Sequence, residues 1–276
     1  MPEPSPPPVY VRRFDAFDRV LHGLLMLSFL GLAATGLPLF FSDAPWAARL
    51  TRIFGTFEIA GWLHRVAALL LIGVFVTHLG RLARRLIAGR DYGVLWGPNS
   101  MVPQPRDGRD LAAHLRWFVG RGPRPRFGRF TYWEKFDYWA VFWGMAIIGT
   151  SGLLLWFPEF FARFLPGWVF NIALLIHGEE ALLAVGFIFT IHFFNGHLRP
   201  EKFPMDPVIF TGRLTEDELR HERPDEYDAL VRDGRLADVR VDPPPRWLVL
   251  LGRTIGVIAI TTGLSLVALI LYAVLA

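Results

Sequence analysis

The chain has 276 residues, 53% of them hydrophobic, and a formal net charge of +4. It contains no cysteine, which excludes cysteine-ligated iron–sulfur clusters and the Cys-x-x-Cys-His attachment of c-type haem. Its arginines are dispersed through loops that flank apolar runs, a distribution that argues against nucleic-acid binding. The proline-rich start, residues 1–8, lacks a positive region ahead of an apolar core, so we expect no cleavable signal peptide.

Five long apolar runs predict five membrane-spanning helices. They are Val20–Phe41, Ile59–Leu79, Phe136–Phe157, Val169–Phe194 and Trp247–Ala276. Each can cross a hydrocarbon core of about 30 Å, which takes about 20 helical residues, and a helix satisfies its own backbone in lipid. We therefore expect an all-α membrane protein with a cytoplasmic tail at 1–19, a four-helix core at 20–200, a cytoplasmic segment at 201–246 and a fifth helix at 247–276.

The basic residues predict the orientation of these spans. Of the 29 lysines and arginines, 24 lie in the N-terminal tail, in residues 81–135 and in residues 199–246. The positive-inside rule places those three segments in the cytoplasm. We expect the protein in the inner membrane of a bacterium. With the N-terminus in the cytoplasm, an odd number of spans places the C-terminus outside.

Two long cytoplasmic loops interrupt the spans. The loop at residues 88–130 contains one short candidate helix, Gly108–Val119. In the second loop, Thr215 and Glu218 have the spacing of a capping box, and the helix they begin is expected to run to about Asp233, before Gly234. The loops are either solvated connectors or surfaces for a partner subunit or for quinone access.

The sequence contains an internal repeat. Arg13–Phe41 aligns without gaps on Arg129–Phe157, and Glu58–Thr77 aligns on Asn171–Thr190. Among the matched positions, His64 coincides with His177, and Thr35-Gly36 with Ser151-Gly152. Spans 1–2 and spans 3–4 are therefore two copies of one helical hairpin. Both copies begin in the cytoplasm, so we expect parallel repeats packed as a four-helix bundle.

Six of the eight histidines lie in or at the ends of spans 1, 2 and 4. They are His22, His64, His78, His177, His192 and His197. Ionisable residues inside membrane spans are rare, costly and usually functional. His114 and His221 fall in the cytoplasmic loops, where we expect them on the surface.

The spacing of the span histidines indicates cofactor binding. His64 and His78 are 14 residues apart, and His177 and His192 are 15 apart. At 100° and 1.5 Å per residue, each pair returns to nearly one helix face, about 21 to 22 Å along the axis. His64 and His177 then lie at similar depth near the outer surface, the arrangement for bis-histidine ligation of one haem. A second haem is expected about 20 Å deeper.

Several short motifs add a family resemblance. Span 1 opens with Arg19-Val-Leu-His22, span 2 with Leu63-His64-Arg65, and span 4 ends with His197-Leu-Arg-Pro-Glu-Lys. Over residues 10–205 the chain resembles the b-type cytochrome membrane subunits of respiratory formate dehydrogenases, nickel–iron hydrogenases and thiosulfate reductases. The resemblance implies two b haems, one held by His64 with His177 and one by His22 with His192. It also implies electron transfer between a quinone and an outer redox subunit, either an iron–sulfur protein or a multihaem cytochrome c.

Two departures from that pattern leave alternatives open. His78 is an extra histidine at inner depth, and the spacings of 14 and 15 also resemble cytochrome b6, in which spans 2 and 4 supply all four ligands. His78 would then pair with His192, although the span-1 motif favours His22. A third haem that uses the spare histidines, His197 included, is a further alternative. His78, His197 and Asn195 are also candidates to hydrogen-bond a quinone.

We therefore predict an electron-transfer subunit of an oxidoreductase, embedded in membrane lipid and not catalytic alone, with quinone redox chemistry as the one exception left open. The rival interpretation is a haem-free transporter or channel, since parallel repeats and intramembrane ionisable residues also fit that class. A transporter is expected to contain helices broken near mid-span. The prolines closest to this role, Pro38 and Pro158, lie at span ends instead.

Overall fold

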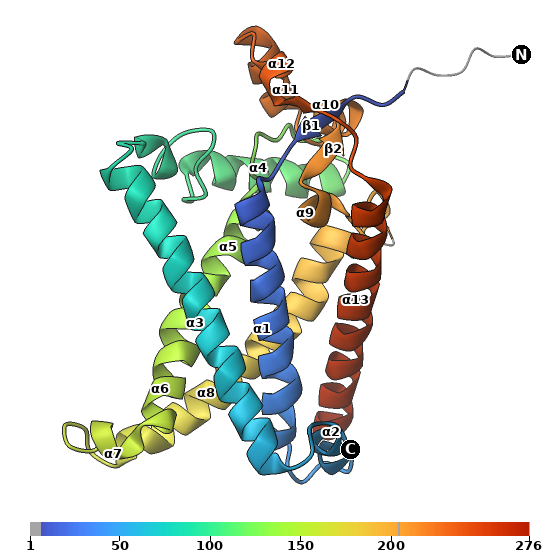
Figure 1. Cartoon of the computed structure of the whole chain (residues 1–276). Helices are drawn as coiled ribbons and strands as arrows, with labels where there is room; N and C mark the ends of the chain where they lie inside the picture. Colours follow the sequence, from blue (N-terminus) through green and yellow to red (C-terminus); the bar gives the residue numbers. More distant parts are fainter. Residues whose placement is uncertain (1–6, 204, 276) are drawn as a thin grey trace, which may run out of the picture. The chain divides into compact units, whose positions relative to one another are not determined.

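The computed structural model describes residues 7–203 and 205–275. Its helices confirm the five predicted spans (Figure 1). Spans 1, 2 and 5 are the single helices α1 (Ala16–Phe40), α3 (Phe57–Ile87) and α13 (Arg246–Leu275). Span 3 consists of α5 (Tyr132–Gly144), the π-helical turn η2 (Met145–Gly149) and α6 (Thr150–Trp156). Span 4 consists of α8 (Trp168–Phe187) and the π-helical turns η3 (Ile188–His192) and η4 (Phe194–Leu198).

The chain folds as two compact units. The bundle unit contains Val20–His78, Ala140–Asp206 and the chain from Leu251 onward. The loop unit contains the chain up to Arg19, Leu79–Trp139 and Pro207–Leu250. Most of every span belongs to the bundle unit, and the short elements of the two long loops belong to the loop unit.

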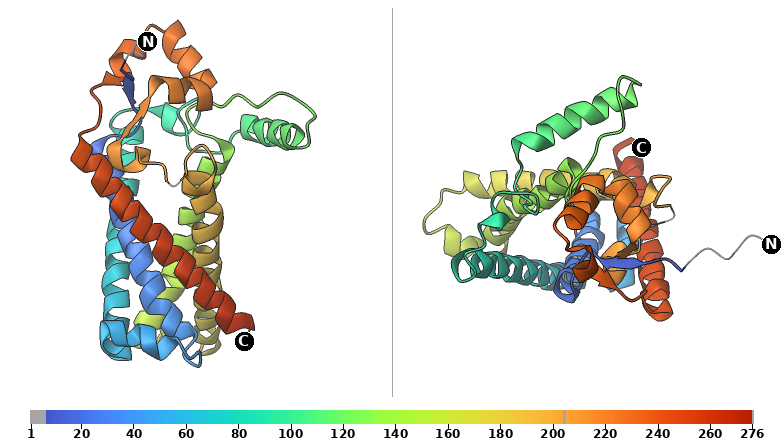
Figure 2. Two further views of the ribbon diagram at one scale, coloured as in Figure 1. Left: turned by 90° about the vertical axis from the view of Figure 1, so that its right-hand side faces the viewer. Right: turned by 90° about the horizontal axis from the view of Figure 1, so that it is seen from above.

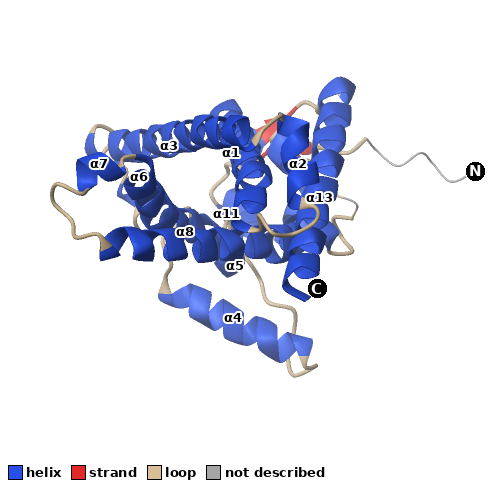
Figure 3. Ribbon diagram, turned by 90° about the horizontal axis from the view of Figure 1, so that it is seen from below, coloured by secondary structure: helices blue, strands red, loops and turns tan. Residues whose placement is uncertain are grey.

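In the bundle unit, α13 packs beside α1 and the end of span 4 (Figure 3). The buried core joins Leu37 of α1, Phe189 of η3 and Leu266 of α13. Glycine permits this approach, because a Cβ at Gly263 would lie 2.3 Å from the Phe189 ring. Small residues at helix interfaces allow such close packing in membranes. The short helices α2 (Ala47–Phe54) and α7 (Pro158–Phe161) complete the unit.

The loop unit contains a three-stranded sheet that the sequence did not predict. Strand β1 (Tyr10–Arg12) lies between β2 (Arg213–Thr215) and β3 (Arg240–Val241), and both pairings are antiparallel. Val11 and Leu214 are buried beneath the sheet, next to Leu219. The N-terminal tail and the segment after span 4 are therefore parts of one small core.

The helices of the loop unit partly correct the predicted ones. Helix α4 (Pro105–Phe118) begins three residues earlier than expected, because Gln104 and Asp107 form a capping box ahead of the predicted start. The helix expected from Thr215 to Asp233 is instead two helices, α10 (Glu216–Glu222) and α11 (Pro224–Arg232). Pro224 explains the break, since a proline disfavours helical geometry in the residue before it.

The predicted capping box of α10 is confirmed. The Thr215 hydroxyl accepts from the Glu218 backbone N–H, and the Glu218 carboxylate accepts from the Thr215 N–H at 2.7 Å. The remaining elements of the loop unit are short: η1 (Tyr92–Val94), α9 (Val208–Thr211) and α12 (Leu236–Val239). Gly212 ends α9 with a left-handed φ of +74°, and a Cβ there would lie 2.6 Å from the Phe14 carbonyl oxygen.

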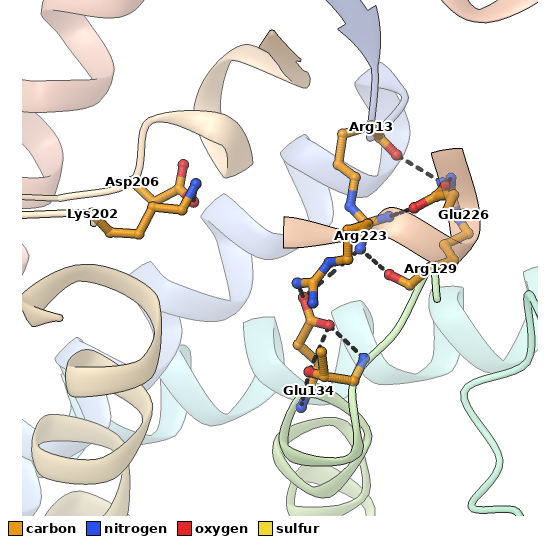
Figure 4. A network of polar contacts seen from close by, with 8 residues as sticks. Arg13, Arg129, Glu134, Lys202, Asp206, Arg223 and Glu226 are labelled. Atoms are coloured by element: carbon orange, nitrogen blue, oxygen red, sulfur yellow. Dashed lines mark hydrogen bonds and ion pairs between the residues drawn. The ribbon is translucent and has the colours of Figure 1, made fainter. Parts of the chain in front are cut away.

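A buried ionic cluster links the beginnings of the two repeats (Figure 4). Arg13 donates to the Arg129 carbonyl, and Arg129 donates to the Arg13 carbonyl at 2.8 Å. Glu226 of α11 accepts from both guanidinium groups, at 3.0 and 2.8 Å. Burial lowers the pKa of Arg13 to about 10, against the opposing effect of Glu134. Arg13 therefore remains charged at neutral pH. We call Arg13, Arg129 and Glu226 the arginine clasp.

Candidate functional site

All six span histidines belong to the bundle unit. His22 lies on α1, His64 and His78 on α3, and His177 on α8. His192 is the last residue of η3, and His197 lies in η4. Each of the six side chains is partly exposed in the structure.

The structure brings the rings of His64 and His177 together in an edge-to-face arrangement. Their ring centroids are 6.3 Å apart, with 71° between the ring planes. The two histidines hold equivalent positions in the internal repeat. Their surroundings are equivalent as well: the Thr35 hydroxyl lies 3.1 Å from His64 Nδ1, and the Ser151 hydroxyl lies 3.1 Å from His177 Nδ1.

These hydroxyls determine which ring nitrogen carries the proton. Thr35 donates its hydroxyl hydrogen to the Gly31 carbonyl at 2.6 Å, and Ser151 donates to the Ile147 carbonyl at 2.7 Å. A hydroxyl has one hydrogen to donate, so each accepts from the neighbouring Nδ1–H. His177 Nδ1 also lies 3.1 Å from the Ile148 carbonyl, which can only accept. Both rings therefore present an unprotonated Nε2, the form in which histidine binds a metal.

A glycine stands beside each ring of this pair. A Cβ at Gly36 would lie 3.0 Å from His64 Cε1, and a Cβ at Gly152 would lie 2.9 Å from His177 Cε1. Any larger residue would push the ring away from its hydroxyl partner. The Thr/Ser-Gly pair near the ends of spans 1 and 3 therefore positions the histidine of the following span, a role that the sequence alignment did not reveal.

The inner histidines form a second group. The side chains of His22, His192 and His197 lie near one another. The ring of His78 meets Phe142 edge-on, with centroids 6.3 Å apart. The structure thus brings one histidine of span 1 close to the two inner histidines of span 4.

The π-helical turn η3 explains the unequal histidine spacings. Between His177 and His192 the chain has one residue more than between His64 and His78. A π turn bonds residue i to i+5 and so contains one residue more than an α turn. Because η3 lies between His177 and the end of span 4, it absorbs the extra residue. We therefore expect the His192 side chain to point in the direction around the helix axis that a 14-residue α-helical spacing would give.

His197 has the opposite protonation pattern to the outer pair. Its Nδ1 accepts from the Asp206 backbone N–H at 3.2 Å, so the ring proton lies on Nε2. The Asp206 carboxylate pairs with the buried Lys202 ammonium at 3.0 Å. His197 therefore presents a hydrogen-bond donor where His64 and His177 present a lone pair.

The two loop histidines differ from each other. His221 is exposed, and its Nε2 lies 2.8 Å from Arg124 Nη1. His114 was expected on the surface, but it is partly buried and stacks on Phe118 with centroids 4.5 Å apart. Its Nδ1 lies 3.0 Å from the Tyr132 hydroxyl. The aromatic residues around it come from the first turn of span 3 and the end of α4, a contact that sequence order does not predict.

The family model for the prokaryotic cytochrome b561 proteins matches residues 13–199. The chain belongs to the prokaryotic cytochrome b561 family. The match includes both repeats and all six span histidines, and it ends before the segment that leads to α13.

Curated relatives agree with membership of the cytochrome b561 family. The cytochrome b556(fdo) subunit of formate dehydrogenase from Escherichia coli K12 is 24% identical over 174 residues, 63% of this chain and 72% of the relative. The formate dehydrogenase cytochrome b556 subunit of Haemophilus influenzae is 25% identical over 173 residues, 60% of this chain and 62% of the relative. The chain is therefore a multi-pass b-type cytochrome of electron transport with bacterial relatives.

Proposed function

We propose that this b-type cytochrome holds two haems between its helices and carries electrons between a quinone pool and a partner redox subunit. The single observation that carries the proposal is the repeat-related pair His64 and His177. Two neighbouring imidazoles, each with an unprotonated Nε2 and a hydrogen-bonded Nδ1–H, form the donor set of a bis-histidine haem.

The distance between these rings fits a metal placed between them. Two metal–nitrogen bonds of about 2 Å and two ring radii of about 1.1 Å give a centroid separation of about 6 Å. The observed separation is 6.3 Å. Gly36 and Gly152 keep both rings in this position, and Thr35 and Ser151 orient them.

For the inner haem we propose His22 and His192 as ligands. The resemblance of the Arg-x-x-His opening of span 1 supports this pairing. His197 suits a different role, because its lone-pair Nδ1 is already occupied and its Nε2–H can donate. We assign it to hydrogen-bond a quinone carbonyl, with Asn195 in the same turn and His78 as further candidates.

When bound, haem b supplies one-electron redox chemistry. The chain's own residues would position and tune it: His64 and His177 would hold the outer haem, and hydroxyls and a backbone carbonyl hold their Nδ1 protons. Two histidine ligands leave no open coordination position, so substrate oxidation belongs to the partner. Since the relatives are subunits of formate dehydrogenase, we propose an iron–sulfur protein or a multihaem cytochrome c as the outer partner.

The proposed location is the inner membrane of a bacterium, with the N-terminus in the cytoplasm and the C-terminus outside. The distribution of basic residues supports this orientation. Electrons would then cross the membrane along the line from the inner histidines to His64 and His177.

The decisive measurement is a reduced-minus-oxidised optical spectrum of the purified protein, with haem quantified per chain. We expect two b haems per chain in the native protein. In either His64→Ala or His177→Ala we expect one haem per chain. A loss of the second haem in His22→Ala but not in His78→Ala supports the proposed inner pair, whereas the reverse result assigns His78. Folded protein that binds no haem, despite adequate haem supply, would favour the transporter interpretation.

A further inference from the structure

Helix α4 has three distinct sides. Asp107 and His114 lie on the side that faces the rest of the loop unit. On a second side, Leu111 and Leu115 lie within about 40° of each other around the helix axis, and their side chains are 41% and 57% exposed. The third side is basic. Arg109 and Arg116 lie there within about 20° of each other around the helix axis, and both side chains are exposed.

The packed side fixes α4 against the first turn of span 3. Asp107 pairs with the Lys135 ammonium at 2.9 Å, and His114 Nδ1 lies 3.0 Å from the Tyr132 hydroxyl. One turn further along α5, Trp139 donates to the Met101 carbonyl at 3.0 Å. Because span 3 begins at Tyr132, these contacts hold α4 at the depth where that span enters the membrane.

The orientation and composition of α4 suit a position at the membrane surface, where span 3 enters. The helix lies crosswise to α5 (Figures 1 and 2). Its apolar stripe includes Phe118, the last residue of α4, and is followed by Val119; the two side chains are 66% and 69% exposed. A helix with Leu and Phe on one face and Arg on its polar face is suited to lie in the plane of a membrane interface.

We propose that α4 is an interfacial anchor, whose apolar stripe enters the acyl region and whose Arg109 and Arg116 bind anionic phospholipid headgroups. Charge complementarity selects the lipid, since Arg109 and Arg116 lie about 100 to 160° around the helix axis from Leu111 and Leu115, on the polar side of an interfacial helix, where guanidinium groups attract anionic headgroups. The anchor depends on the chain's insertion in a membrane and is independent of haem binding.

The absence of cysteine allows a site-specific test. A bimane label is placed on Leu115→Cys in the full chain, in nanodiscs of phosphatidylcholine with phosphatidylglycerol. We expect quenching by lipid-borne nitroxide and protection from aqueous iodide. The control is Arg232→Cys on α11, whose native side chain is 73% exposed; its label should show the reverse pattern. Equal iodide quenching at both positions, or protection of Leu115→Cys from both quenchers, overturns the proposal.

The arginines are tested in the same labelled protein. Arg109→Gln with Arg116→Gln should reduce the preference of the label for nitroxide phosphatidylglycerol over nitroxide phosphatidylcholine, by about fivefold per arginine. Arg232→Gln in the Leu115→Cys protein is the matched control and should leave the preference unchanged. A preference that survives the double substitution overturns the assignment of anionic lipid. Matching size-exclusion profiles establish that every variant is folded.

Discussion

Gly152 has no free space beside its Cα on the side of His177. A methyl group there would approach the ring to 2.9 Å, so Gly152→Ala should displace His177 and reduce haem from two per chain toward one. Pyridine haemochrome analysis of purified protein measures this ratio. Gly186→Ala is the matched control, because a Cβ at that glycine meets nothing within 4 Å. Full haem content in Gly152→Ala would contradict the proposed role of the glycine.

The Thr35 hydroxyl is expected to tune the outer haem through His64. Thr35→Val keeps the shape but removes the acceptor for Nδ1–H, which makes the imidazole a weaker electron donor. We expect a more positive midpoint potential and haem affinity lower by about 10- to 100-fold. A redox titration and haem retention during gel filtration measure the two effects. Thr35→Ser should restore both values, and unchanged values in Thr35→Val would show that the hydroxyl has no such role.

At the scale of residues, the sequence predicted that His64 and His177 lie at similar depth, and it missed the contacts that hold their rings. Helical spacing and the internal repeat contain enough information to place two histidines at one depth. The hydroxyl of Thr35 meets His64 across two helices, and that contact depends on interhelical distance and rotation. Likewise, His114 looked like an ordinary loop residue until the fold placed Tyr132 beside it.

At the scale of elements, α13 depends on glycine where it meets span 4. Gly263→Leu would place a branched side chain where even a Cβ lies 2.3 Å from Phe189. Overpacking of this kind costs about 1 to 3 kcal/mol, so we expect a lower thermal unfolding midpoint in detergent. Ser265→Leu adds similar bulk at an exposed position of α13 and should change the midpoint little. Equal effects of the two substitutions would argue against the glycine contact.

The spans were predictable and the sheet was not, for one physical reason. A membrane span needs about 20 consecutive apolar residues, and such a run is unmistakable in a sequence. Strands β1, β2 and β3 have three, three and two residues, too few to show alternation. Their pairing also joins segments about 200 residues apart in the chain. Pro224, by contrast, was a local signal that should have divided the predicted α10–α11 helix.

At the scale of the whole molecule, the arginine clasp joins distant parts of the chain. Glu226→Gln would leave Arg13, 6% exposed, and Arg129 without their shared carboxylate. Removing one partner of a buried ion pair costs about 3 to 5 kcal/mol. We expect faster proteolysis within residues 201–246 and a lower unfolding midpoint.

The control for the clasp is Asp228→Asn on the same helix. Asp228 is 61% exposed and pairs with Arg126 at the surface, where an ion pair contributes about 0 to 1 kcal/mol. Its loss should change proteolysis little. If Glu226→Gln were no more susceptible than Asp228→Asn, the clasp would not stabilise the segment.

The order of synthesis determines when the arginine clasp can form. Arg13 leaves the ribosome first, Arg129 follows more than a hundred residues later, and Glu226 follows after the fourth span. The carboxylate can accept from both guanidinium groups only when both hairpins have emerged and their starts lie side by side. The arginine clasp can therefore close only after both hairpins have been synthesised, and a chain arrested earlier would lack the carboxylate that Arg13 and Arg129 share.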